Sequence, residues 1–445
     1  MFRYHPSSED KLTHNMLQPG LSHDIKKILN KIPELIKKTF PIPGRFRHSL
    51  PSDIAELSRL LTNNRGERHL SYLTRANYLS AYLYYFMPWN IYRLCLLLAD
   101  IDLRLGADDI ITDLGCGPLT FASALWIARP ELRGIPLEIN CVDKSKPVLE
   151  AGKKFFLSLC EAENKINRWR INLIKEDIDI RKGGYVSEQQ YKTNSANKTG
   201  ICKKASLVCA VNFFNEIYEN ISHNNTEGLR RIAENAARIT HNIASDSALI
   251  LTVEPGVPQS GKFISFLRDS FLELNRPPLS PCTHSASCPM LHGKEIKISA
   301  NNQKKKQTQK RWCHYAFDTV YAPDELQRLS SAAGLSKERL VFSFLLTGNV
   351  SSGSHSSKIR KSDKIRVISD AFPINIHDQH VKNTEKIQKQ IKRFGRYGCS
   401  EDGLILLSGN KDQIEKINSF SIISSAGKTM QTVDKKSGAY ILEME

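Results

Sequence analysis

A glycine-rich turn after a short β-prone run constrains the fold of this chain more than any other stretch. Residues 110–114 read Ile-Ile-Thr-Asp-Leu, Gly115 and Gly117 follow at alternate positions, and a helix-prone run begins at Phe121. Glycines directly after a strand let the backbone pass close to a ligand, and the next helix offers unpaired N–H groups to a polar or anionic group. The stretch therefore predicts a nucleotide-type ligand site at the end of a strand.

The spacing of the glycines separates two kinds of nucleotide site. A dinucleotide fingerprint needs glycine at its first, third and sixth positions, whereas Thr120 holds the sixth position here and Asp113 precedes the first glycine by two residues. The run Asp-Leu-Gly-Cys-Gly-Pro resembles the first motif of class I S-adenosylmethionine (SAM) methyltransferases. That resemblance implies that Asp113 and the backbone of Gly115, Cys116 and Gly117 hold the methionine end of SAM.

Polar side chains follow the next predicted strands, as a ligand crevice in an open α/β sheet requires. These strands cover residues 137–142, 171–174, 206–211 and 248–253. Asp143 ends the first of them, where both Rossmann-type families bind a ribose diol. Asp177 would match the adenine-binding position of the methyltransferase family, and Asn212 follows the third strand. We therefore predict a SAM site that includes all three residues, against the alternative of a doubly wound domain without a cofactor.

Length and pattern divide the chain into three predicted parts, because 445 residues exceed one ordinary core. Residues 1–105 predict a helical N-terminal domain, since apolar residues recur there at helical spacing and Pro88 should kink or split the last helix. Residues 106–276 predict the SAM-binding, Rossmann-like core with a doubly wound sheet. Residues 277–445 predict a cysteine-containing basic region that completes the sheet. The expected fold class is α/β.

The charge of the chain indicates a polyanionic partner. The net charge is +17 and the pI is near 9.3. Clusters of cations lie after residue 290, at 304–306, 310–311, 358–361, 364–366 and 389–396. Phe394 and Tyr397 are interleaved with the last cluster, which favours nucleic acid over a merely solvated basic surface.

No stretch of the sequence has the pattern of a membrane-spanning or targeting segment. No apolar run approaches the length of a membrane span. The N-terminus lacks the apolar region of a signal peptide and the acid-poor character of a transit peptide. The sequence therefore predicts a cytoplasmic protein with no membrane partner, and we expect a monomer.

Four of the ten cysteines stand outside any core periodicity. Cys282 and Cys288 lie in Pro-Cys-Thr-His-Ser-Ala-Ser-Cys-Pro, Cys313 lies in Trp-Cys-His-Tyr, and Cys399 lies in Tyr-Gly-Cys-Ser. In a cytoplasmic protein such cysteines more often bind a metal than form disulfides. Four thiolates suit tetrahedral zinc or an iron–sulfur cluster, and their spacing alone does not choose the metal or exclude four unrelated cysteines.

These cysteine segments, together with the upstream helical region and the Asp-Leu-Gly-x-Gly-Pro turn, resemble the Rsm-type family of methyltransferase-like proteins that act on the small ribosomal subunit. The resemblance covers roughly Leu50 to Leu407. It implies a methyltransferase fold and association with small-subunit rRNA and ribosomal proteins in ribosome assembly and translation. It also implies a 4Fe–4S cluster whose ligands are Cys282, Cys288, Cys313 and Cys399. His284 and His314 flank these ligands but are not expected to bind the cluster.

Two alternatives to an RNA-associated, SAM-binding protein stay open. The first is a catalytically active SAM-dependent RNA methyltransferase, and the second is a zinc-stabilised RNA-binding module without SAM turnover. Leu119 stands where many relatives have glycine, and the run after Asn212 lacks the prolines of amino-directed enzymes. Cys282 follows proline, as a cytosine-directed nucleophile would, but a ligated thiolate is not free to attack carbon. No catalytic residue is assigned.

Overall fold

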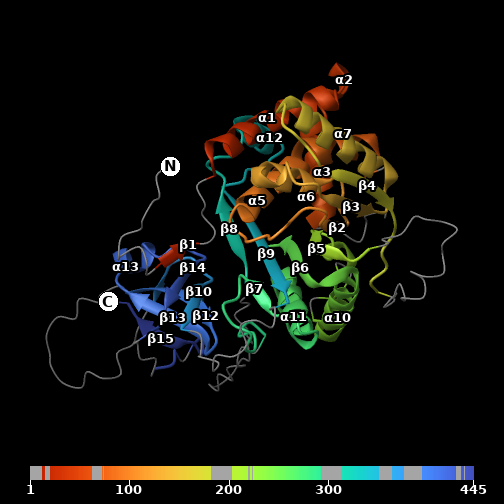
Figure 1. Ribbon diagram of the computed structural model, residues 1–445. Helices are drawn as coiled ribbons and strands as arrows, with labels where there is room; N and C mark the ends of the chain where they lie inside the picture. The colour runs from red at the N-terminus through yellow and green to blue at the C-terminus, as the bar shows by residue number, and fades with distance from the viewer. Residues whose placement is uncertain are drawn as a thin grey trace, which may run out of the picture.

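The structure is a computed structural model, and it describes residues 13–15, 21–62, 73, 75–181, 203–218, 221–222, 224–291, 312–349, 363–374, 393–426, 432–434 and 436–444. Two sheets organise these residues (Figure 1). Most of the predicted basic clusters, Lys389 and Lys392 included, lie outside the described residues. Among the described helices, none is long and apolar enough to cross a membrane.

The N-terminal region is helical, as predicted. Its elements are α1 (His23–Thr39), α2 (Gly44–Arg47), α3 (Leu50–Thr62), α4 (Ala76–Ala81), the π-helical turn η3 (Tyr82–Phe86) and α5 (Met87–Leu98). Pro88 lies in the first turn of α5, where its missing N–H leaves no bond unmade, and the π-helical turn comes directly before it. The predicted disturbance of this helix takes the form of that π-helical turn, and the backbone stays helical from Ala76 to Leu98, so the helix is not split.

The larger sheet follows and is mixed. Its strands are β2 (Ile110–Leu114), β3 (Glu138–Asp143), β4 (Arg170–Lys175), β5 (Ala205–Val211), β6 (Ala244–Pro255), β7 (Pro278–Ser280), β8 (Tyr315–Asp318) and β9 (Arg339–Gly348). The order is β4-β3-β2-β5-β6-β9-β7, with β8 also paired to β9. The first five strands are parallel and β9 is antiparallel to β6. The order reverses between β2 and β5, which places a ligand crevice at their carboxyl ends.

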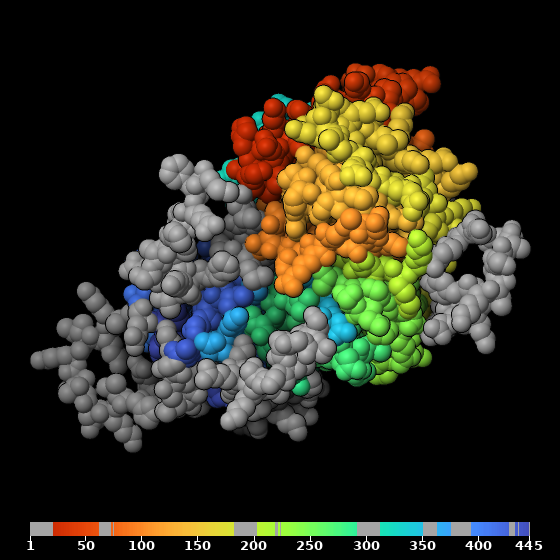
Figure 2. Space-filling view, in the orientation of Figure 1, coloured from red at the N-terminus to blue at the C-terminus, as the bar shows by residue number. Residues whose placement is uncertain are grey.

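Helices cover both faces of this sheet, so the predicted doubly wound architecture is confirmed. They are α6 (Thr120–Ala128), α7 (Lys146–Ala162), α9 (Asn215–Tyr218), α10 (Thr226–Ile243), α11 (Pro258–Glu273) and α12 (Asp324–Ala332), with the 3₁₀ turn η4 (Pro130–Leu132). One apolar cluster joins the N-terminal helices to α6, α7 and one face of the sheet. A second cluster joins α10 and α11 to the other face. Figure 2 shows the atoms of these elements as one body.

Of the C-terminal region predicted to complete the sheet, only β7, β8 and β9 do so, and the described residues from Lys364 on form a separate, smaller sheet beside that body (Figure 1). It contains β10 (Lys364–Val367), β11 (Phe372–Ile374), β12 (Arg393–Ser400), β13 (Gly403–Gly409), the helix α13 (Lys411–Glu415), β14 (Ser421–Ser424) and β15 (Tyr440–Glu443). The order is β14-β10-β12-β13-β15, with the short β1 (Thr13–Asn15) at the β14 edge. Strand β15 runs parallel to β13, and the other pairs are antiparallel.

Candidate functional site

The turn after β2 has the left-handed backbone that its glycines predict. Gly115 has φ +63° and Gly117 has φ +53°. A Cβ atom at Gly115 would lie 2.2 Å from the ring of Phe213, so only glycine fits there. Leu119 is also left-handed, with φ +54°, and is fully buried next to the start of α6. The left-handed backbone at Leu119 is a conformation that glycine adopts freely. A residue with a Cβ atom, such as leucine, adopts it at a steric cost of roughly 1–2 kcal/mol.

Asp113 supplies a buried carboxyl group beneath this turn. The residue is 1% exposed, and its Oδ1 accepts a hydrogen bond from the Cys209 thiol at 3.4 Å. Its Oδ2 has no hydrogen-bond partner among the described residues. Burial raises the pKa of Asp113 to about 8. A cationic donor placed at Oδ2 would pair this carboxyl and favour its ionised form.

Asp143 joins the tip of β3 to the same turn. Its Oδ2 accepts from the backbone N–H of Gly117 at 3.1 Å, and its Oδ1 accepts from that of Ser145 at 2.8 Å. The side chain of Ser145, the N-cap residue of α7, makes no capping hydrogen bond. A carboxylate has about four acceptor positions, so two remain for hydroxyl donors such as a ribose diol. Burial raises the pKa of Asp143.

The N-terminal helices supply a wall of the site that our sequence analysis missed. Tyr82 begins η3, and Asn90 and Arg93 lie on α5. Arg93 Nη2 donates to Asn90 Oδ1 at 2.9 Å and to Asn212 Oδ1 at 3.2 Å, and the residue is 7% exposed. The guanidinium therefore holds both amide oxygens toward itself. The available signal was the i, i+3 spacing of Asn90 and Arg93 in an otherwise apolar helix.

Glu254, at the end of β6, fixes the loop that follows Asn212. The residue is fully buried, and its two oxygens accept from the backbone N–H groups of Phe214 and Asn215, each at 3.0 Å. Burial raises the pKa of Glu254 to about 8, and Arg93 acts against this shift. This loop holds Asn212 itself in a left-handed conformation, with φ +53°. Glu254 is a second residue that our sequence analysis did not assign to the site.

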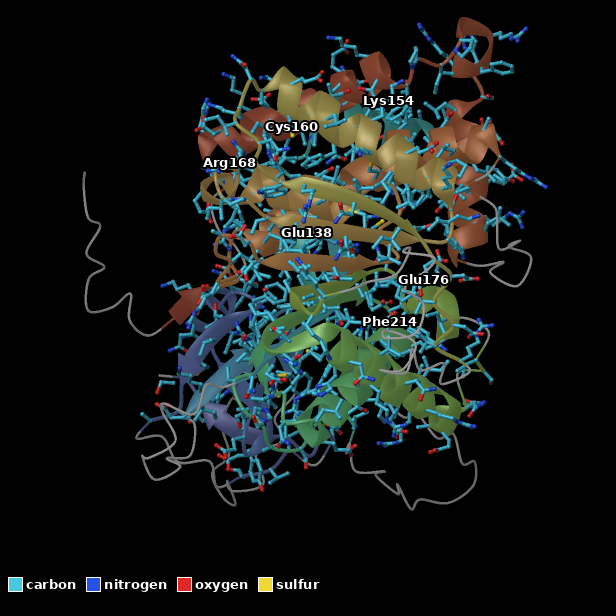
Figure 3. All side chains as sticks on the ribbon, turned by 45° about the vertical axis from the view of Figure 1, so that its right-hand side comes forward. Glu138, Lys154, Cys160, Arg168, Glu176 and Phe214 are labelled. Carbon is cyan, nitrogen blue, oxygen red and sulfur yellow. The ribbon has the colours of Figure 1, made fainter. Side chains whose placement is uncertain are left out.

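These groups enclose a hollow at the carboxyl ends of β2 and β5. Its empty volume is about 270 Å³, part of it open to solvent, and it is lined by Tyr82, Asn90, Asp113, Gly115, Cys116, Thr120, Phe121, Val211 and Asn212. The structure thus brings together four of the predicted residues, Asp113, Gly115, Cys116 and Asn212. Asp177 lies beyond β4, exposed and outside this lining. Figure 3 shows its neighbour Glu176, and Phe214, toward this end of the strands.

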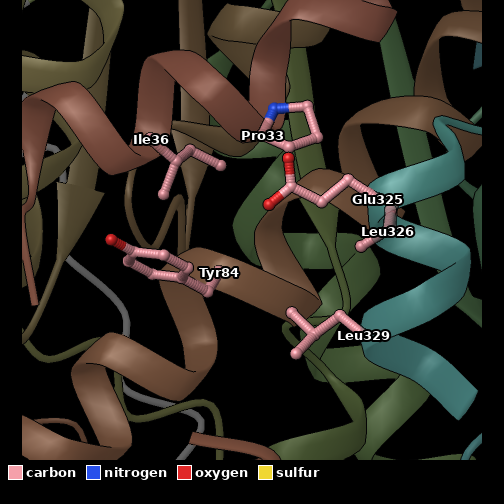
Figure 4. A pocket seen from close by; sticks show the side chains of 6 residues that line it. All are labelled: Pro33, Ile36, Tyr84, Glu325, Leu326 and Leu329. Atoms are coloured by element: carbon pink, nitrogen blue, oxygen red, sulfur yellow. The ribbon is translucent and has the colours of Figure 1, made fainter. Parts of the chain in front are cut away.

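A second hollow lies between α1, η3 and α12 (Figure 4). It has an empty volume of about 230 Å³ and is lined by Pro33, Ile36, Tyr84, Glu325, Leu326 and Leu329. Glu325 pairs with Lys37 at 2.5 Å, so the charge in this hollow is compensated within the protein. Its other lining side chains are apolar or phenolic, and the hollow offers no set of groups for catalysis or for a metal.

The four predicted metal-binding cysteines converge from three separate segments. Cys282 and Cys288 follow β7, Cys313 precedes β8, and Cys399 lies on β12. Burial and the thiols of Cys282 and Cys288 together raise the pKa of Cys313 to about 12. Burial and the other three thiols all raise the pKa of Cys399. The other three thiols therefore lie within electrostatic reach of Cys399, and all four occupy one neighbourhood.

Two buried guanidinium groups face these thiols. Arg268 is 2% exposed, and its Nη2 donates to the carbonyl oxygens of His284 and Ala286 at 2.9 Å and 2.6 Å. Arg366 is 3% exposed, and its Nε donates to the Pro281 carbonyl oxygen at 2.8 Å. Both arginines lower the pKa of Cys282, against the effect of burial. The neighbourhood therefore holds positive charge opposite groups that become negative as thiolates.

Sulfur and imidazole atoms are the donors that this neighbourhood offers to a metal. Among the residues it describes, no group of three or more His, Cys, Asp or Glu side chains is arranged to hold a single metal ion. His284 Nε2 lies 3.3 Å from Cys399 Sγ, and its Nδ1 is buried without a hydrogen-bond partner among the described residues. Four thiols with compensating cations suit a thiolate-bound centre better than an oxygen-preferring cation.

Two arginines of the predicted basic surface are in fact structural. Arg396 is 8% exposed, and its guanidinium donates to the carbonyl oxygens of Ser369 and Ile414. Arg366 faces the thiols, as described above. The expectation that Arg396 contacts RNA phosphate is therefore wrong, because its hydrogen bonds are made inside the smaller sheet. Arg393 is partly exposed and pairs with Glu443.

Comparisons with known proteins return only distant likenesses to solved structures. No protein-family model and no curated protein matches the chain. Among solved structures, a putative methyltransferase from Thermoplasma acidophilum is 11% identical, with a TM-score of 0.28, and the match covers 56% of this chain and 71% of that one. A SAM-dependent methyltransferase from Geobacter sulfurreducens in complex with S-adenosyl-L-homocysteine is 13% identical, with a TM-score of 0.28 and coverages of 59% and 91%. Aeropyrum pernix fibrillarin with natively bound SAM is 16% identical, with a TM-score of 0.24 and coverages of 43% and 68%. At these TM-scores the likenesses carry no argument about function.

Proposed function

We propose that this chain is an RNA-associated, methyltransferase-like protein that binds SAM at the carboxyl ends of β2, β3 and β5. The observation that carries the proposal is the unpartnered Oδ2 of buried Asp113 beneath a turn of left-handed glycines. An ammonium group is the donor that such a carboxyl lacks, and SAM carries one at its methionine end. SAM, when bound, supplies an electrophilic methyl group.

Each residue of the proposed site has a distinct task. Asp113 accepts hydrogen bonds from the ammonium group, and the remaining acceptor positions of Asp143 serve the ribose hydroxyls. Asn212 Oδ1 accepts a hydrogen bond from Arg93, which uses one of the two lone pairs of that oxygen. The run after Asn212 lacks the prolines of the Asn-Pro-Pro-aromatic motif, which argues against the amino-directed chemistry of that motif. It leaves methyl transfer itself as the second candidate function, with no base assigned.

We also propose that Cys282, Cys288, Cys313 and Cys399 hold a 4Fe–4S cluster. Four cysteine thiolates are the usual ligand set of such a cluster, and the other three thiols lie within electrostatic reach of Cys399. Arg268 and Arg366 compensate the negative charge of the ligated thiolates. The resemblance to the Rsm-type family supports the same assignment and the small ribosomal subunit as the place of action, with zinc as the alternative metal.

Two measurements test the proposal. Isothermal titration calorimetry should show SAM binding to the wild-type protein and about ten- to hundredfold weaker binding to Asp113→Asn, because a hydrogen bond to a charged group contributes about 1.5–3 kcal/mol. Equal affinities would overturn the SAM placement. Anaerobic purification, a visible absorption spectrum and analysis of iron, sulfide and zinc decide the metal, and a colourless zinc protein would overturn the cluster.

A further inference from the structure

The strand order of the smaller sheet has a consequence of its own. Numbered within the sheet, β10 with β11 is strand 1, β12 is strand 2, β13 is strand 3, β14 is strand 4 and β15 is strand 5. The observed order is then 4-1-2-3-5, with strand 5 parallel to strand 3 and the helix α13 between strands 3 and 4. That is the topology of the five-stranded, partly open barrel called the oligonucleotide- and oligosaccharide-binding (OB) fold.

The two faces of strand β12 have different environments. Alternate residues of a strand share a face. A Cβ atom at Gly398 would lie 2.4 Å from Cγ2 of Ile365, so Gly398 faces the barrel core. The other face carries Arg393, Gly395, Tyr397 and Cys399, and it is the outer face of the barrel. In OB folds the surface over strands 2 and 3 is the one that binds ligands.

An aromatic pair stands on this outer face. Phe372 lies directly opposite Gly395 in the strand register, and its ring centroid is 4.9 Å from that of Tyr397, with the planes tilted by 33°. Both side chains are partly exposed. Gly395 leaves no side chain between Arg393 and Tyr397 along the strand. Partly exposed rings on a sheet face are groups on which bases of single-stranded nucleic acid can stack.

The charge around this face fits a polyanion. Arg393 lies on the same face and is 36% exposed at its side chain. A guanidinium at this position is a hydrogen-bond donor that suits a phosphate as well as its partner Glu443.

We infer that the C-terminal barrel binds single-stranded RNA on its outer β11–β12 face, with bases stacked on Phe372 and Tyr397. The inference deepens the RNA-associated part of the proposed function, on which it rests for the identity of the nucleic acid. It adds a binding site on the barrel and specifies the RNA that binds there. That RNA has unpaired nucleotides, which are recognised by stacking and by phosphate contacts. A duplex is excluded, because its bases are already stacked on one another and present no free face to these rings.

The test is fluorescence anisotropy of the full-length protein with a labelled single-stranded RNA of about 12 nucleotides, within the range of one OB fold. Stacking contributes about 1–3 kcal/mol per base, so the Phe372→Ala/Tyr397→Ala variant should bind at least about tenfold more weakly. Tyr397→Phe keeps the ring and should bind like the wild type. Tyr321→Ala removes a 54%-exposed ring outside the barrel and serves as the matched control.

Two results would overturn the inference: wild-type affinity in the double variant, or a duplex of the same length binding as tightly as the single strand. Photo-crosslinking of the unaltered protein to 4-thiouridine RNA covers the case in which the double variant does not fold. Crosslinks should map to residues 363–409, and crosslinks confined to other parts of the chain would contradict the site. SAM calorimetry on the same samples separates the two claims, because loss of SAM binding bears on the proposed function alone.

Discussion

The two sheets of this protein are stabilised in different ways. The larger sheet is covered by helices on both faces and shares two extensive apolar clusters with them. The smaller sheet has a compact core of eight buried residues, Ile365, Val367, Ile405, Leu407, Ile414, Ile417, Ile423 and Leu442. A small core contributes little net stability on its own. The smaller sheet therefore depends more on polar contacts at its junction with the larger sheet, such as the hydrogen bonds from Arg366 to the Pro281 carbonyl oxygen and from Thr283 to the Lys364 carbonyl oxygen.

Residues of both sheets meet at the junction between them. Cys399 belongs to the smaller sheet, whereas Cys282, Cys288 and Cys313 belong to segments next to β7 and β8 of the larger one. Arg366 extends from β10 to the Pro281 carbonyl oxygen. A metal centre at these thiols would close a long loop, and closing long loops stabilises the folded state most. Each prediction below tests one side of this comparison.

The largest effect is expected from removing a thiol at the junction. Cys399→Ser should lose most of its iron and should expose the smaller sheet to protease, with cleavage faster by on the order of tenfold or more, since a structural metal site contributes many kcal/mol. SAM binding should persist, because the larger sheet keeps its own core. Limited proteolysis, iron analysis and calorimetry on one sample measure all three. Cys160→Ser on α7, far from these thiols in the fold, is the control; full iron occupancy and native protease resistance in Cys399→Ser would contradict the role of Cys399.

A pair of buried arginines sharpens the comparison. Arg366→Met removes hydrogen bonds to the carbonyl oxygens of Pro281 and Phe420, which lie on the two sides of the junction. Arg396→Met removes bonds made entirely within the smaller sheet. Each unsatisfied carbonyl costs about 1–3 kcal/mol. We expect both variants to lower the stability of the smaller sheet, but only Arg366→Met to speed cleavage between the sheets; identical protease patterns would remove Arg366 from the junction.

The cofactor site in the larger sheet should depend on pH through Asp113. Burial raises the pKa of Asp113 to about 8, and an ammonium partner favours the ionised form. SAM affinity should therefore rise as pH increases from 6 to 8, by up to about tenfold per pH unit for one proton released. Calorimetry in buffers of different ionisation enthalpy measures that proton. Glu254 titrates in the same range, so the Asp113→Asn variant should lose the dependence, and its persistence there would assign it to Glu254.

Asp113 also affects the stability of the larger sheet. Its pKa is raised from 3.8 to about 8 on folding, so the folded state binds more protons than the unfolded state between these values. Without SAM, the free energy of unfolding should therefore fall as pH rises through this range. Asp113→Asn should flatten the pH dependence of chemical denaturation of the larger sheet. An unchanged pH profile in this variant would mean that folding does not raise the pKa of Asp113.

The smallest effect is expected from a single exposed cation of the smaller sheet. Each phosphate contact contributes about 0.7–0.9 to the slope of log affinity against log salt concentration. Arg393→Gln should lower that slope for RNA by about one contact. Arg104→Gln, with a side chain 86% exposed in the segment before β2 of the larger sheet, should leave it unchanged. Equal slopes for Arg393→Gln and the wild type would mean that Arg393 serves its pair with Glu443 alone.

The sequence by itself determined the local features of the cofactor site. The β2 strand, the glycine turn and the start of α6 follow one another directly, so the left-handed backbone at Gly115 and Gly117 is a local property of those residues. The parallel strands and their polar ends were also readable, because each strand has its own apolar run. The lack of core periodicity singled out four of the ten cysteines, although these four are spread over more than a hundred residues.

Tertiary structure alone decided the rest, because the contacts involved join residues that no local pattern links. Arg93 reaches Asn212 across 119 residues, and Glu254 holds the loop at Phe214 from the end of another strand. Arg396 looked like part of a basic surface, yet the barrel turns it inward to its own carbonyl oxygens. A run of cationic residues in a strand acquires an inner and an outer face only when the strand is paired, since pairing fixes which alternate side chains face the core.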